Sequence, residues 1–93
     1  MQSIATIPMT LRIERSERRK FKVFTLIGRI EAEHVAGLIE LFDRDYQNII
    51  LDLGELRLAD RGAVRFLKAC EEYGMRFENC PAYIRDWMDR EKD

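Results

Sequence analysis

The chain has 93 residues, of which 16 are basic and 17 acidic, so its formal net charge is −1. Hydrophobic residues make up 46% and charged residues 35%, which is typical of one globular domain. This charge balance gives no electrostatic basis for binding nucleic acid or an anionic membrane, and no apolar run approaches the roughly 20 residues of a membrane span. The N-terminal residues also lack the pattern of a signal peptide, so we expect a cytoplasmic protein, with residues 1–8 as an N-terminal extension.

The sequence contains two cysteines, Cys70 and Cys80, and a single histidine, His34. We expect free thiols, because a reducing cytoplasm disfavours a disulfide. These three residues do not form a zinc-ligand pattern, so the sequence predicts no metal site and no cofactor. His34 is interpreted as an ordinary, partly exposed side chain.

Two strands joined by a hairpin open the predicted fold. Met9–Glu14 alternates apolar and polar residues, which is typical of a half-buried edge strand. The charged stretch Arg15–Lys20 predicts a solvated hairpin loop. Phe21–Ile27 then predicts a more apolar strand, which we expect Gly28 to end.

A helix and a central strand follow. Glu31–Phe42 has a helical period, with an apolar stripe formed by Val35, Leu38, Ile39 and Phe42. Asn48–Leu53 is almost continuously apolar, as in a parallel strand buried on both faces. Gly54 and Glu55 are expected to loosen the chain after it.

The last third of the sequence predicts a helix, a short strand and a final helix. The first helix begins near Asp60 and stops at Gly74, a good C-terminal signal. Its apolar stripe consists of Ala63, Phe66, Leu67, Cys70 and Tyr73. Met75–Glu78 alternates as an edge strand does, and Pro81 suits the first position of the last helix. The inner face of that helix consists of Tyr83, Ile84, Trp87 and Met88.

The resulting order is β-β-α-β-α-β-α, which predicts an α/β fold with about three helices. The last three strands are separated by helices, which favours parallel pairing through right-handed crossovers. The first strand joins by a hairpin and must be antiparallel to the second. We therefore expect a mixed four-stranded sheet with helices packed on it.

Four stretches, in this order, resemble the STAS domain family, the fold of bacterial anti-sigma factor antagonists. Phe24–Glu31 is similar to the family's strand followed by G-x-(L/I)-(D/E), and Asn48–Leu53 is similar to its hydrophobic-x-L-D-L strand. Leu58–Gly62 falls where the family has I-D-S-S-G, and Met75–Pro81 resembles the next strand and helix entry. The resemblance covers residues 9–90 and implies a short, single-domain, STAS-like member that lacks the last strand and helix of longer ones.

The sequence departs from the family at the position that regulated members use as a switch. Those members carry a phosphorylated serine or threonine immediately before the glycine, whereas this chain has Arg61 there. No serine or threonine lies between Asn48 and Asp93, so that switch is absent. The loop is also about one residue shorter, so Asp60 corresponds either to the family's aspartate or to its first serine.

The residues around this helix start are the predicted partner-binding site. Asp60 suits an N-cap, because its carboxylate accepts hydrogen bonds from early helix N–H groups. Arg61, Arg65 and Lys68 recur at helical spacing, either as a solvated face or as a docking stripe for an acidic partner surface. Val64 is included in the predicted partner-binding set.

The resemblance implies a non-enzymatic protein-interaction module of bacterial regulation, whose partner is an anti-sigma factor or a switch kinase. Two other function classes stay open. One is a self-associating scaffold subunit, a homodimer formed through exposed strand edges. The other is a small-ligand, nucleotide-binding or thiol-redox protein, in which Cys80 has a pKa lowered by a helix N-terminus.

Overall fold

The structure is a computed structural model and describes residues 10–91. Its elements are, in chain order, β1 (Leu11–Arg18), β2 (Phe21–Ile30), η2 (Ala32–His34), α1 (Val35–Phe42), η3 (Tyr46–Asn48), β3 (Ile49–Ala59), α2 (Arg61–Glu72), β4 (Arg76–Glu78) and α3 (Ala82–Arg90). The predicted order of strands and helices is therefore confirmed, with two short 3-10 helices added. The predicted N-terminal extension, residues 1–8, lies outside the described residues.

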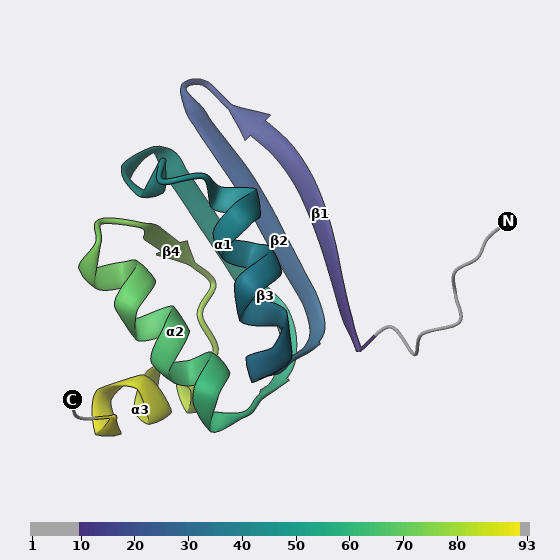
Figure 1. Cartoon of the computed structure of the whole chain (residues 1–93), viewed down its shortest axis with the longest axis vertical. Helices are drawn as coiled ribbons and strands as arrows, with labels where there is room; N and C mark the ends of the chain where they lie inside the picture. The colour runs from purple at the N-terminus through teal and green to yellow at the C-terminus, as the bar shows by residue number, and fades with distance from the viewer. Residues whose placement is uncertain (1–9, 92–93) are drawn as a thin grey trace, which may run out of the picture.

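The four strands form one mixed sheet in the order β1-β2-β3-β4 (Figure 1). β1 pairs antiparallel with β2, while β2 with β3 and β3 with β4 pair in parallel. Each parallel connection contains a helix, as a crossover requires. The predicted mixed four-stranded sheet is confirmed, with β1 and β4 at its two edges.

One face of the sheet carries the hydrophobic core. Figure 1 shows α1 and α2 lying over the sheet, with α3 beside α2. The largest fully buried side chains come from β2, β3 and all three helices: Phe24, Leu26, Ile30, Leu38, Phe42, Ile49, Ile50, Leu51, Leu53, Leu67, Ile84 and Met88. The apolar periodicities read from the sequence therefore identify most of the core, because burial of those side chains is what stabilises the elements.

The predicted hairpin loop is wrong in its extent. β1 continues to Arg18, and only Arg19 and Lys20 form the turn to β2. All residues of β1 after Leu11 are exposed. An edge strand needs no apolar side chains where it faces water, so a charged sequence can still pair fully with its neighbour.

Two glycines that were expected to end or loosen strands lie inside them. β2 passes through Gly28, where φ is 100°, and continues to Ile30. β3 passes through Gly54 and continues to Ala59. Between the pairs Thr25–Asp52 and Ile27–Glu55 the longer strand holds one extra residue, so the irregularity is a bulge and not a break.

Three large side chains assigned to buried stripes are exposed instead. Ile39 is 47% exposed, Tyr73 is 69% exposed and Trp87 is 37% exposed. Tyr73 lies at the C-cap of α2, beyond the last turn that packs on the sheet.

Pro81 is the N-cap of α3 and not its first helical residue. Gly74 ends α2 with a φ of 102°, as predicted.

The opposite face of the sheet is closed by polar side chains. Val23 and Ile50 are paired neighbours, and both are buried although they lie outside the main core cluster. On the edge strands, the Arg18 guanidinium donates two hydrogen bonds to the Glu78 carboxylate, at 2.8 and 3.2 Å. This ion pair joins the first strand to the last across the sheet, on the same face as Val23 and Ile50.

Candidate interaction site at the start of helix α2

Asp60 caps α2 and joins it to the preceding crossover. Its backbone is extended, and its Oδ1 accepts a hydrogen bond from the Ala63 N–H at 2.9 Å. Its Oδ2 accepts a second hydrogen bond from the Ala32 N–H, at the start of η2, at 3.0 Å. The predicted N-cap is confirmed, and the same carboxylate ties together the chain segments that follow β2 and β3.

These two segments touch closely beside Asp60. A Cβ placed on Gly62 would lie 2.7 Å from the Cβ of Ala32, which is too close for two carbon atoms. Gly62 is therefore required for the approach of α2 to η2. Both segments follow the carboxyl ends of neighbouring parallel strands, the edge where α/β folds commonly place their sites.

The three predicted basic residues do share one side of α2, which we call the α2 basic face (Arg61, Arg65 and Lys68). Their cationic groups meet Glu91, just after α3. Arg61 Nε lies 3.0 Å from Glu91 Oε2, and Arg65 Nε lies 3.4 Å from Glu91 Oε1. The Lys68 ammonium donates a hydrogen bond to the main-chain oxygen of Glu91. The face is thus occupied by the chain's own carboxylate.

Val64 does not belong to this face. Its side chain is only 2% exposed and packs in the core cluster that also contains Ile84 and Met88 of α3. The prediction that Val64 contacts a partner is corrected on this ground. On the helical surface Val64 lies next to the buried stripe of Ala63 and Leu67, and α2 is buried over that wider arc.

Arg61 lies at the exposed start of α2. It occupies the first residue of α2, and its side chain is 78% exposed. A cation is unfavourable at the positive end of a helix dipole, so helix stability does not account for Arg61. The carboxylates of Asp60 and Glu91 offset that repulsion locally.

Both cysteines are free, and both have environments that disfavour the thiolate. Burial raises the pKa of Cys70 to about 12. Burial also raises the pKa of Cys80, and the nearby Arg85 lowers it by less. The predicted lowering of the Cys80 pKa is therefore wrong, because loss of hydration outweighs the neighbouring positive charge.

His34 has a structural role in its crossover. The Glu31 N–H donates to Nδ1 of His34 at 2.9 Å, so the neutral ring carries its proton on Nε2. That Nε2 lies 3.3 Å from the Thr10 hydroxyl. Potential ligand atoms of Glu31, Glu33 and His34 lie within 4.8 Å of one another, but these hydrogen bonds occupy both ring nitrogens.

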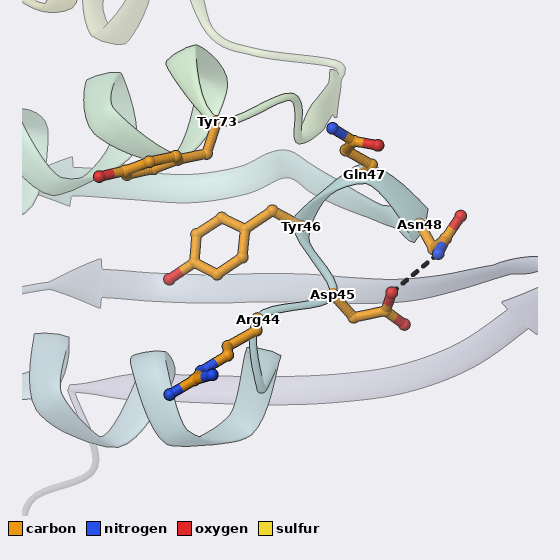
Figure 2. A pocket seen from close by; sticks show the side chains of 6 residues that line it. All are labelled: Arg44, Asp45, Tyr46, Gln47, Asn48 and Tyr73. Carbon is orange, nitrogen blue, oxygen red and sulfur yellow. Dashed lines mark hydrogen bonds between the residues drawn. The ribbon is translucent and has the colours of Figure 1, made fainter.

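A concavity of about 460 Å³ lies at the other end of α2 (Figure 2). It is lined by Arg44, Asp45, Tyr46, Gln47, Asn48 and Tyr73. The rings of Tyr46 and Tyr73 meet edge to face, with centroids 5.7 Å apart. Sequence reasoning identified none of these residues as a site. The local feature that marks this concavity is a pair of successive residues with positive φ, Asp43 and Arg44. The sequence did not reveal it, because backbone angles cannot be read from a sequence.

Among residues 10–91, no helix has both the length and the apolar character needed to cross a membrane. Neither a protein-family model nor a curated protein matches the chain by sequence. The structure does match a solved structure, an antisigma-factor antagonist STAS domain from Rhodobacter sphaeroides, with a TM-score of 0.59 at 11% identity. The match covers 76% of this chain and 88% of that one. At this identity the likeness concerns the fold, and it confirms the fold that the sequence motifs implied: the chain has a STAS-domain fold.

Proposed function

We propose that the protein is a non-enzymatic interaction module of bacterial regulation, similar to an anti-sigma factor antagonist. Its partner would be an anti-sigma factor or a switch kinase, bound in the cytoplasm. The observation that carries the proposal is the STAS-domain fold combined with an exposed, tightly held α2 start at Asp60, Arg61 and Gly62. Binding would not be switched by phosphorylation there, because the position before Gly62 has no hydroxyl group.

The shape of this region supports recognition of a protein surface more than chemistry on a substrate. Asp60 uses both carboxylate oxygens in backbone hydrogen bonds, so neither is free to act as a base. Arg61 and Arg65 are paired with Glu91 but still have exposed side-chain fractions of 78% and 58%. Rigid backbone with exposed arginines is typical of an interface in which Arg anchors the partner.

Calorimetry with candidate anti-sigma factors and kinases tests this proposal. Arg61→Glu should weaken partner binding by about tenfold or more, because charge reversal at an interface introduces repulsion. Arg12→Glu is the matched control, since Arg12 is 70% exposed on the distant strand β1. Equal losses in both variants, or no loss in either, would argue against a docking site at the α2 start.

The concavity at the other end of α2 supports a small-ligand function as the second candidate. Arg44 has no ion-pair partner among residues 10–91, whereas Asp45 lies 3.7 Å from Lys22 and accepts from Asn48. The lining therefore favours an anionic ligand with a planar part that contacts Tyr73. Thermal melts with a panel of nucleotides and aromatic carboxylates, repeated on Tyr73→Ala, would reveal such a ligand through a shift that the variant loses.

Self-association through β1 has less support. Five of its eight residues are charged, and all except Leu11 are exposed. Charged side chains of this kind keep an edge strand from pairing with another chain. A single monomeric species in light scattering at high micromolar concentration is the expected result.

A further inference from the structure

The α2 basic face already holds one carboxylate, and its geometry indicates what the face recognises. Arg61 and Arg65 approach different oxygens of Glu91, at 3.0 and 3.4 Å, while Lys68 holds the main chain of the same residue. The Glu91 side chain is only 15% exposed, although it follows the last helix. Two arginines that flank one carboxylate, with a lysine that holds the main chain beside it, form a carboxylate-binding site.

The occupancy by Glu91 is imperfect, which makes exchange feasible. Its Oε1 is shielded from solvent and accepts no hydrogen bond, since Arg65 Nε approaches it only at ion-pair distance. A shielded oxygen without a hydrogen bond is unfavourable. The two arginine side chains meanwhile remain more than half exposed, so donor groups are left for an incoming ligand. A carboxylate that engages an arginine through two parallel bonds would satisfy the site better than Glu91 does.

We propose that Glu91 is an internal stand-in for an acidic side chain of the protein partner. The partner binds by placing its own aspartate or glutamate against Arg61 and Arg65, and Glu91 is displaced. This inference rests on the proposed function, to which it adds the chemistry of the partner surface and a device that controls access to it. A surface without a well-placed carboxylate cannot displace Glu91, so the contact adds selectivity.

The test uses the full chain, a blocked hexaglutamate peptide as the probe, and Glu91→Gln as the key variant. Glutamine keeps the size of the side chain and removes its charge. The wild type should bind the peptide weakly, and Glu91→Gln should bind it about three- to tenfold more tightly, because a competing intramolecular ligand is lost. Asp89→Asn, which removes one negative charge from an exposed position on α3, should match the wild type.

NMR signals of the Arg61 and Arg65 Nε–H groups locate the binding. The peptide should shift these signals in Glu91→Gln, and Glu91→Gln/Arg65→Gln should lose the gain in affinity. Equal affinity of the wild type, Glu91→Gln and Asp89→Asn would overturn the inference. Peptide-induced shifts outside α2 and α3 would overturn it as well, as would inorganic phosphate binding to Glu91→Gln as tightly as the peptide.

The same variants separate this inference from the proposed function. A partner that loses affinity with Arg61→Glu, but binds the wild type and Glu91→Gln equally, leaves the proposed function in place and removes the stand-in role of Glu91. The reverse result is that Glu91→Gln gains peptide binding but no candidate partner loses affinity with Arg61→Glu. In that case the carboxylate site exists and the proposed partner class is wrong.

Discussion

Asp60, the residue immediately before α2, has a fixed structural task. One oxygen accepts from Ala63 and the other from Ala32, so a single side chain holds α2 and η2 at once. A carboxylate at a helix N-terminus also interacts favourably with the helix dipole. The residue thus provides a permanent negative charge at the start of α2.

Replacing Asp60 should therefore cost more than the loss of an ordinary cap. Asp60→Ala removes both acceptors, and we expect it to lower the free energy of unfolding by about 2 kcal/mol, measured by urea denaturation. Asp60→Asn keeps one acceptor oxygen and should lose about half as much. Asp86→Ala, which removes an exposed ion pair with Arg90 within α3, is the control and should stay within about 0.5 kcal/mol. A similar loss in Asp60→Ala and Asp86→Ala would contradict the double-cap role.

At the scale of elements, α3 is attached to α2 by a paired ion bridge as well as by apolar packing. The Arg85 guanidinium donates two hydrogen bonds to the Glu71 carboxylate, both at 2.9 Å. The hydrogen bond from Arg85 lowers the pKa of Glu71, and burial opposes that effect. This bridge holds the helix that carries Glu91 to the α2 basic face.

The depressed pKa of Glu71 predicts an acid-sensitive contribution to stability. Because the folded pKa lies below the unfolded value of about 4.3, the stabilisation is present above that pH and is lost as the pH falls through the folded pKa. Between pH 7 and pH 3 the wild type should thus lose more stability than Glu71→Gln. The difference should be below about 1 kcal/mol, because the Glu71 side chain is 40% exposed. Urea titrations at several pH values measure it, and Glu72→Gln, at the exposed neighbouring position, should follow the wild type.

Sequence patterns predicted the elements well where burial controls them. The period of Leu38 and Phe42 in α1, and the apolar run that contains Leu51 in β3, reflect side chains that must leave water. The same patterns failed for Arg15–Arg18 in β1, because an exposed edge strand does not require apolar side chains. Gly54 was misjudged because a bulge depends on the neighbouring strand.

The candidate site was predictable only in part. Asp60 could be identified as a cap because capping is a local property of the sequence. The role of Glu91 depends on how α3 packs on α2. Glu91 is 23 residues from Lys68 along the chain, so no local pattern predicts their contact. Val64 was misplaced for the same reason, since α3 contributes to the core that covers it.

At the scale of the whole molecule, Cys70 is a natural reporter of global opening. Its side chain is 1% exposed, and burial raises its pKa to about 12. A thiol reacts as the thiolate, so the native state protects Cys70 both sterically and chemically.

We expect alkylation at pH 8 to modify Cys80 first and to spare Cys70 until the urea unfolding transition begins. Peptide mapping by mass spectrometry distinguishes the two sites. Asp60→Ala should start to label Cys70 at a lower urea concentration than the wild type, because less energy is needed to open the fold. Labelling of both thiols at one rate in native buffer would show that Cys70 is reached without unfolding.

The simple strand order β1-β2-β3-β4 has a consequence for how the chain is made. Every strand pairs with the strand that comes next in the sequence. The hairpin can therefore form as soon as it leaves the ribosome, and each later strand joins an existing edge without opening earlier pairs. The strands can therefore add to the sheet in the order in which they are synthesised. The α2 basic face stays uncovered until α3 and Glu91 have left the ribosome and packed on α2.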